Sequence, residues 1–184
     1  MFENINKLFK YKWDSEFFRR LTSRNGESTI PESVSRDIRT GCGLMIAATI
    51  ISCINSIMMA NIGIGIANDM INKVTDINFK FNLSGLAAFG SIGSAIFGTI
   101  IICLIRSYFT GNNVRKSLAF CVLLGFSILA MISSVLGVIG AFTSFAFGFF
   151  IGLLNLLNIA LVFTAMANIS VGCIDFCLEA NGEK

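Results

Sequence analysis

The feature that most constrains this chain is a long segment, from Ser117 to Asn168, that contains no Asp, Glu, Lys, Arg or His. About 20 consecutive apolar residues are enough for one helical membrane crossing, so this segment is too long for a single span. The whole chain agrees, since 54% of its residues are hydrophobic and 14% are charged. The sequence therefore predicts an all-α integral membrane protein.

Four apolar segments account for the predicted membrane crossings. They cover residues 43–66, 84–106, 117–140 and 142–167, and at about 1.5 Å per residue each is long enough to cross a hydrocarbon core of about 30 Å. Helices are expected because lipid offers no hydrogen-bond partners to an open backbone. The last two segments, separated only by residues 140–144, are predicted to form a tight hairpin, which either spans the membrane or is re-entrant.

The expected organisation has three parts. Residues 1–42 form a cytoplasmic N-terminal helical region, residues 43–168 a four-helix transmembrane bundle, and residues 169–184 a cytoplasmic C-terminal tail. Lys and Arg, which favour the cytoplasmic side of a membrane, are concentrated before the first span and between the second and third spans. We therefore expect a multi-pass protein of the cell membrane with both termini in the cytoplasm.

The N-terminal region carries bulky apolar residues at every fourth position, which a single helix would place on one face. Such a helix would lie in the plane of the membrane, with its basic residues among the lipid headgroups. The residues expected at the membrane surface are Phe9, Trp13, Phe17, Lys7, Lys12 and Arg19. Glu16 and Arg20 interrupt the apolar face, so a helix packed on a partner or on the protein itself is an equal alternative.

Residues suited to catalysis, metal binding or nucleic-acid recognition are scarce. The chain has six Cys and no His, and although Cys173 and Cys177 are one helical turn apart, no carboxylate cluster completes a tetrahedral metal site. No predicted span contains an ionisable acid or base in its interior. The basic residues flank the spans without interleaved aromatic residues. We expect no enzymatic activity, no cofactor, no metal and no nucleic-acid partner; acylation of a Cys near the membrane is an open alternative to plain thiols.

Small residues recur at intervals of four along three of the spans. Small side chains at this spacing let two helix backbones approach closely, which favours association in lipid. The partner helix is expected in the same chain, in preference to another chain. The predicted helix-packing residues are Ala48, Ser52, Ser56 and Ala60 in the first span, Gly90, Ser94 and Gly98 in the second, and Ser144, Gly148 and Gly152 in the fourth.

Three asparagines lie near the middle of predicted spans. Asn55 belongs to the first span, and Asn155 and Asn158 belong to the fourth. An amide that faces lipid is costly, so these side chains are expected to point inward. The favoured interpretation is a hydrogen-bonded clamp between the two helices, and the alternative is a polar site for a small solute at the middle of the membrane.

These patterns favour a protein that acts through interactions and not through catalysis. The main hypothesis is an accessory or assembly subunit of a membrane complex, whose partners are the lipid bilayer and other membrane-protein subunits or further copies of the chain. The alternative hypothesis is an oligomeric pore or a small-solute transporter subunit that conducts its solute past the asparagines.

Overall fold

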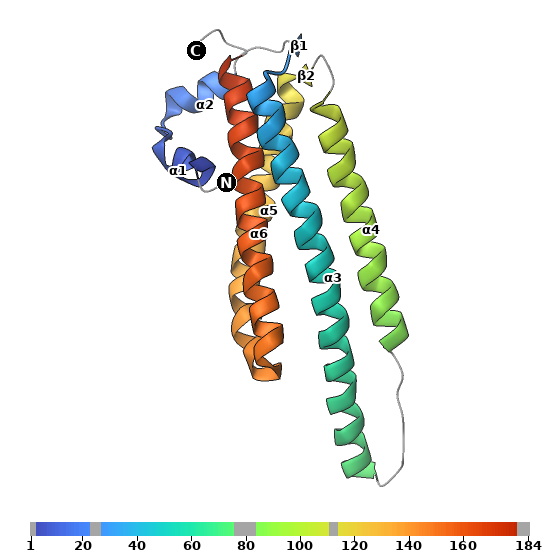
Figure 1. Ribbon diagram of the computed structural model, residues 1–184. Helices are drawn as coiled ribbons and strands as arrows, with labels where there is room; N and C mark the ends of the chain where they lie inside the picture. Colours follow the sequence, from blue (N-terminus) through green and yellow to red (C-terminus); the bar gives the residue numbers. More distant parts are fainter. Residues whose placement is uncertain (1–2, 23–26, 76–83, 111–113, 180–184) are drawn as a thin grey trace.

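The computed structural model describes residues 3–22, 27–75, 84–110 and 114–179 (Figure 1). Almost every described residue belongs to a helix, as predicted. In chain order the elements are α1 (Glu3–Lys10), α2 (Ser15–Thr22), β1 (Glu27–Ser28), α3 (Glu32–Thr75), α4 (Ser84–Tyr108), β2 (Val114–Arg115), α5 (Lys116–Phe147) and α6 (Phe149–Glu179).

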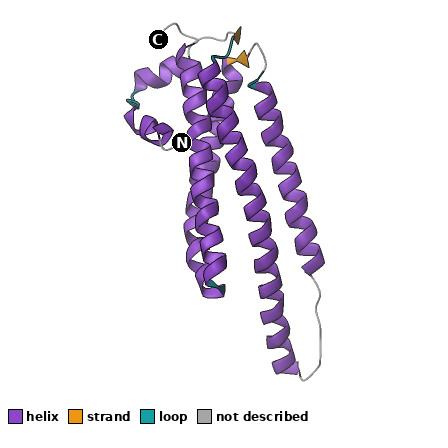
Figure 2. Ribbon diagram, viewed as in Figure 1, coloured by secondary structure: helices purple, strands orange, loops and turns teal. Residues whose placement is uncertain are grey.

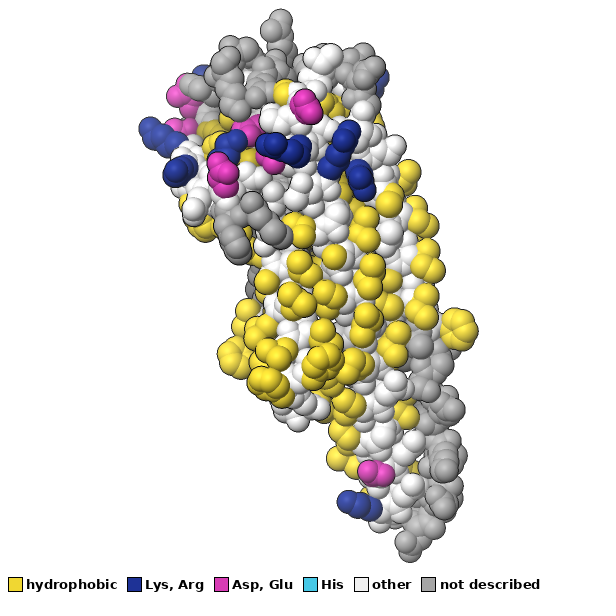
Figure 3. Space-filling view, viewed as in Figure 1, with side chains coloured by type: hydrophobic (Ala, Val, Ile, Leu, Met, Phe, Trp, Pro, Cys, Tyr) yellow, Lys and Arg dark blue, Asp and Glu magenta, His cyan; other side chains and the backbone are white. Residues whose placement is uncertain are grey.

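Three helices among the described residues are long and apolar enough to cross a membrane, namely α3, α4 and α6. Their surfaces suit a lipid environment, because large hydrophobic side chains such as Phe97, Leu104 and Leu157 are exposed on them. Figure 3 shows these side chains spread along the helices, while Lys, Arg, Asp and Glu gather at the end that carries α1 and α2. The structure therefore indicates a multi-pass membrane protein.

The four long helices lie in a row. Helix α3 packs against α4 on one side and α6 on the other, and α6 packs in turn against α5 (Figure 1). The order across the molecule is therefore α4, α3, α6, α5. Helices α4 and α5 are the two edges of this row, and both expose large hydrophobic side chains.

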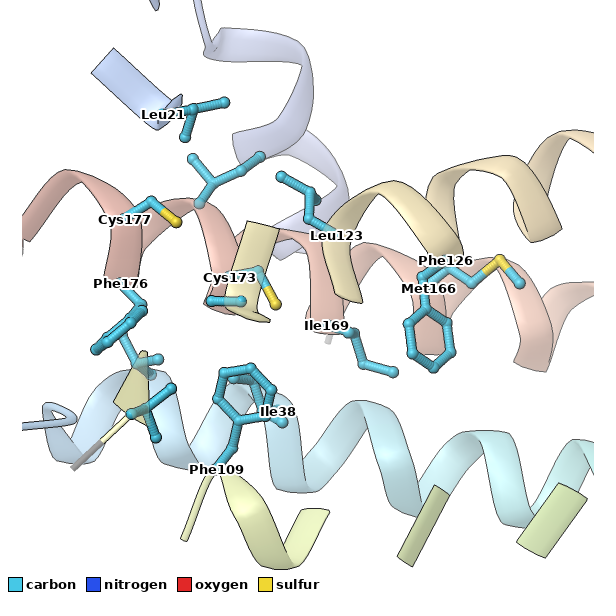
Figure 4. Close-up of a cluster of buried hydrophobic side chains, with 14 of the residues drawn as sticks. Leu21, Ile38, Phe109, Leu123, Phe126, Met166, Ile169, Cys173, Phe176 and Cys177 are labelled. Carbon is cyan, nitrogen blue, oxygen red and sulfur yellow. The ribbon is translucent and has the colours of Figure 1, made fainter. Parts of the chain in front are cut away.

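The best-packed core lies at the α1–α2 end of the row. There Ile38 of α3, Phe109 after α4, Leu123 of α5 and Phe176 of α6 come together (Figure 4). Leu21 of α2 closes the cluster from the outside. Because α6 remains helical and buried to this depth, the first part of the segment expected as a C-terminal tail, residues 169–179, belongs to the last turns of α6.

Two glycines let α3 and α6 approach each other within this core. A Cβ atom added to Gly41 would lie 2.7 Å from the carbonyl oxygen of Ala165, and one added to Gly172 would lie 2.7 Å from Cγ1 of Ile38. Real Cβ atoms do not approach other atoms so closely, so only glycine fits at either position without movement of the neighbouring helix. Neither residue was among the predicted helix-packing positions.

The hairpin between α5 and α6 turns later than predicted. The turn was expected at residues 140–144, but α5 continues to Phe147 and Gly148 alone separates the two helices. Gly148 has a φ of 150° and a ψ of 141°, a conformation that side chains of L residues rarely adopt. Ser144 lies inside α5, where its hydroxyl donates to the carbonyl oxygen of Gly140, four residues earlier.

The N-terminal region is not one helix with one apolar face. It consists of α1 and α2, separated by residues 11–14, because the carboxylate of Asp14 accepts a hydrogen bond from the backbone N–H of Phe17 at 2.7 Å and so starts a second helix. Both helices pack on α6. Phe17 consequently lies in the protein core, while Phe9 and Trp13 are exposed.

A short pair of strands joins two distant parts of the chain at the same end. Strand β1 pairs with β2 in antiparallel register, Glu27 opposite Arg115 and Ser28 opposite Val114 (Figure 2). The segment before α3 and the connection between α4 and α5 therefore lie at the same end of the molecule.

Candidate functional site

Asn55 and Asn155 meet between α3 and α6. The side-chain nitrogen of Asn55 donates a hydrogen bond to the side-chain oxygen of Asn155 at 2.6 Å, and only 7% of Asn55 is exposed. The residues lie on neighbouring helices of the row, each inside an apolar stretch. Lipid offers neither amide a hydrogen-bond partner, so an unpaired amide there would cost free energy. The structure thus brings two of the three predicted asparagines together.

Asn155 also links α6 to α5. Its side-chain nitrogen donates to the hydroxyl of Ser144 and, at 3.2 Å, to the backbone carbonyl oxygen of Gly140. Ser144 is 1% exposed, and its buried hydroxyl oxygen accepts this hydrogen bond near the hairpin. One amide side chain therefore connects α3, α6 and α5.

Two buried amide oxygens in this region have no hydrogen-bond partner among the described residues. They are Oδ1 of Asn55 and Oδ1 of Asn158. A buried acceptor without a partner costs about 1–3 kcal/mol, and ordered water is one of the groups that can supply such a donor. Asn158 lies one helical turn from Asn155, but no hydrogen bond joins it to Asn55 in the described structure.

A cavity of about 280 Å³ lies beside these amides, with walls from all four long helices. Its polar lining consists mainly of small hydroxyl groups and of the side chains of Asn155 and Asn158. Ser52, Ser56 and Ser94 are exposed, so the cavity opens to the surface of the row. The hydroxyl residues that line it are Thr49, Ser52, Ser56, Ser91 and Ser94. We call this feature the hydroxyl cavity.

The hydroxyl cavity is suited to hydrogen bonding and not to proton transfer. No Asp, Glu, Lys, Arg or His is among its described lining residues, and the Cys53 thiol has no base beside it there. Ser94 donates to the carbonyl oxygen of Ser91 at 2.9 Å, and Thr49 donates to that of Met45 at 2.8 Å. Their hydroxyl oxygens remain acceptors for a neutral polar group.

The predicted helix-packing residues have several different surroundings. Ala48, Ser52, Ser56 and Ser94 line the hydroxyl cavity. A Cβ atom on Gly98 would lie 3.8 Å from Thr49, and one on Gly152 would clash with the ring of Phe145. Nothing lies within 4 Å of a Cβ atom placed on Gly90, and Ala60 is half-buried, whereas Ser144 and Gly148 belong to the hairpin described above.

Lys7, predicted at the membrane surface, binds a carboxylate instead. Its ammonium group forms an ion pair with Asp175, and the hydroxyl of Tyr11 donates to the other oxygen of the same carboxylate at 2.9 Å. Asn4 donates to Asn168 at 2.8 Å, about two turns before Asp175 on α6. Burial and the neighbouring Asp175 raise the pKa of Tyr11 well above its usual value. Lys12 and Arg19 are exposed.

Asp175 was missed in the sequence analysis, although one signal was present. It is the first acidic or basic residue after the long uncharged segment, it lies on a helix with apolar neighbours, and it is 6% exposed. A lone carboxylate in such surroundings is normally paired, and the basic N-terminal region offered the partners.

Comparison of the chain with protein-family models, with curated proteins and with solved structures finds no significant match.

Proposed function

We propose that the chain crosses the membrane four times, with the α1–α2 end in the cytoplasm. Helix α5 has 32 residues, which at about 1.5 Å per residue is long enough to cross the hydrocarbon core beside α6. The paired strands place the segment before α3 and the connection between α4 and α5 at one end. Both segments are rich in Lys and Arg, which supports a cytoplasmic position for that end.

We infer that the protein acts as an interaction subunit of a membrane complex. The observation that carries this proposal is the exposed hydroxyl cavity on a surface that is otherwise apolar. Hydroxyl and amide groups that face acyl chains lack hydrogen-bond partners, which costs free energy. A transmembrane helix of another subunit that covers the cavity removes this cost for the exposed hydroxyl groups.

The covering helix is expected to combine small residues with one polar donor. Small residues are needed because Ser52, Ser56 and Ser94 form a shallow wall that only a closely approaching backbone reaches. A donor such as Ser, Thr, Asn or Gln at mid-span matches the exposed hydroxyl oxygens of the cavity. The partner is either a different subunit or a second copy of the chain.

Photo-crosslinking in native membranes tests this proposal. We expect benzoylphenylalanine at Ser94, at the cavity, to give one discrete protein adduct, whose mass distinguishes a second copy from a different subunit. Benzoylphenylalanine at Phe97, which is 66% exposed on the same helix, is the matched control and should label mainly lipid. Lipid adducts alone from both positions would contradict the interaction model.

A second function, passage of a small neutral solute, is favoured by the polar lining of the hydroxyl cavity. In that case the cavity is part of a polar path, and its hydroxyl and amide groups form hydrogen bonds with the solute. Glycerol or urea flux in proteoliposomes checks this alternative. Asn158→Leu should then reduce flux without lowering thermal stability, whereas wild-type vesicles no more permeable than protein-free vesicles would exclude it.

A further inference from the structure

A second, largely apolar groove lies at the α1–α2 end, away from the hydroxyl cavity. It has a volume of about 510 Å³ and is bounded by α1, α2, the connection between them, and the facing sides of α5 and α6. We call it the interfacial groove. Residues that represent its four sides are Leu8, Trp13, Phe18, Leu124, Ser127 and Phe163.

The lining of the interfacial groove matches an acyl chain. Ser127 and Ser170 are the polar residues among its described lining residues, and the others are aliphatic or aromatic, apart from the small residue Ala167. Phe18, Leu124 and Phe163 are each about half exposed, so the groove opens outward onto the same surface of α5 and α6 that faces lipid. In a membrane the apolar molecules at this surface are lipid chains.

The charge around the groove favours an anionic headgroup. From α1 to the end of α2 the chain carries five basic residues and three acidic ones. Lys12 is adjacent to Trp13; it forms an ion pair with Asp14 at 3.9 Å, and its side chain is 91% exposed. Figure 3 shows Lys and Arg gathered at this end of the molecule. Basic residues near a membrane surface attract anionic lipids.

We propose that the interfacial groove binds one acyl chain of an anionic phospholipid, taken from the leaflet at the α1–α2 end. The headgroup then lies beside the basic residues of α1 and α2, and the chain fills the space between these helices and the α5–α6 pair. The lipid acts as a structural ligand that holds the N-terminal helices against the membrane-embedded helices. This assignment does not depend on which partner covers the hydroxyl cavity.

The chain contains its own reporter for this site. Trp13 is the one tryptophan of the sequence, it lines the groove, and its indole N–H donates to the carbonyl oxygen of Leu8 at 3.2 Å. Bromine atoms on an acyl chain quench a tryptophan only at short range. Brominated phosphatidylglycerol, added in small molar excess to the full-length protein in detergent, should therefore quench Trp13 and saturate near one lipid per chain.

Two phenylalanine variants separate the groove from the general protein surface. Ser127→Phe places a ring inside the groove. Ile128→Phe places the same ring at the next position, where the native side chain is 57% exposed and does not line the groove. We expect Ser127→Phe to raise the half-saturating lipid concentration by about tenfold or more, equivalent to about 1.4 kcal/mol, and Ile128→Phe to leave it unchanged. Quenching that rises in proportion to lipid without saturation would overturn the proposal.

Two measurements on the wild-type protein keep the proposal testable if Ser127→Phe does not fold. Native mass spectrometry should find one retained phospholipid on each chain, and a lipid-free chain or dimer would contradict the assignment. Brominated phosphatidylcholine should need a higher concentration than phosphatidylglycerol to half-saturate quenching, with a difference that shrinks in high salt. Equal values for the two lipids would overturn the anionic preference.

Discussion

Asn155 joins three helices through one side chain, so its amide takes part in more interhelical hydrogen bonds than the amide of Asn55 does. Asn55 makes one described side-chain hydrogen bond, to Asn155, and keeps an unpartnered oxygen. Asn155 accepts that bond and also donates to Ser144 and Gly140. Removal of Asn155 therefore affects the contacts of α6 with both α3 and α5.

We expect Asn155→Leu to destabilise the protein more than Asn55→Leu does. Loss of Asn55 removes one membrane hydrogen bond, worth about 1 kcal/mol, and loss of Asn155 removes several, worth roughly 2 kcal/mol. The double variant should be no less stable than Asn155→Leu alone, because the shared bond has already been lost. Unfolding in mixed detergent micelles measures these free energies.

Asn158→Leu is the matched control for these variants. Its side-chain oxygen has no partner among the described residues, so its replacement should leave the free energy of unfolding unchanged or slightly increased. Strictly additive losses for Asn55 and Asn155, or a large loss for Asn158, would show that the amides do not form the clamp described here.

Tyr11 gives stability an alkaline limit. The pKa of Tyr11 is raised in the folded protein from the ordinary value of 10.0, first by burial and then by the carboxylate of Asp175. The unfolded chain therefore loses this proton at a lower pH than the folded chain does. Its stabilising contribution is complete below about pH 10 and is lost as the pH rises further.

We expect thermal stability in detergent to fall more steeply above about pH 10 in the wild type than in Tyr11→Phe. The two proteins differ only in this hydroxyl group, so the comparison isolates its contribution. Trp13 fluorescence provides a local signal, since its ring lies 6.3 Å from that of Tyr11. Parallel pH profiles for the two proteins would contradict the assigned role.

At the scale of elements, the long helices were predictable and several boundaries were not. Hydrophobic length identified α3, α4 and α6 because lipid requires internally bonded helices. The break between α1 and α2 depends on one capping carboxylate, Asp14, within a pattern that a longer helix also satisfies. The turn at Gly148 depends on a backbone conformation that spacing does not reveal.

Contacts between helices were predictable only where the polar groups had few possible partners. Asn55 and Asn155 were named from the sequence because a polar side chain in a span needs another polar group. The close approach at Gly41 and Gly172 was missed, since Gly41 lies before the first predicted span and Gly172 after the last. Asp175 also lies after the last predicted span, and its partner Lys7 is distant from it in the sequence.

Gly148 provides a test of the hairpin that joins α5 to α6. Gly148→Ala should destabilise the protein by about 1–3 kcal/mol, because the backbone of the alanine residue must adopt a φ of 150°. Lack of space is not the cause, since the nearest atom to the added Cβ is Ile151 Cδ1 at 3.9 Å. Detergent unfolding measures the difference.

Gly125→Ala is the matched control on α5. Nothing lies within 4 Å of a Cβ atom at Gly125, and alanine is favoured over glycine inside a helix. This variant should be as stable as the wild type or more stable. Equal behaviour of the two alanine variants would mean that the turn carries no conformational strain.

At the scale of the whole molecule, the row consists of a central pair of helices and two edge helices. The α3–α6 pair forms the centre, and the edge helices α4 and α5 offer most of their surface to the surroundings. The hydroxyl cavity opens on the surface of this row, and charged side chains gather at the α1–α2 end of the row. Orientation in the membrane then decides which compartment contains α1, α2 and their proposed lipid.

Cysteine labelling in intact cells tests the proposed orientation. On a background without the six native cysteines, Val74→Cys, near the far end of α3 and 84% exposed, should react with a membrane-impermeant reagent. Thr110→Cys, exposed at the α1–α2 end, should react only after permeabilisation. The reverse pattern would invert the topology, and labelling of both positions from outside would rule out the single crossing by α4 that the proposal places between them.

The one-residue link at Gly148 has a consequence for how the protein enters a membrane. A chain that inserts its helices singly must move each intervening polar loop through the hydrocarbon, but here Phe147 and Phe149 flank a single glycine. No hydrophilic cargo opposes the passage of this tip, and neither helix has a flanking charge at that end to halt it. Insertion of α5 and α6 as one preformed unit is the route that this geometry favours.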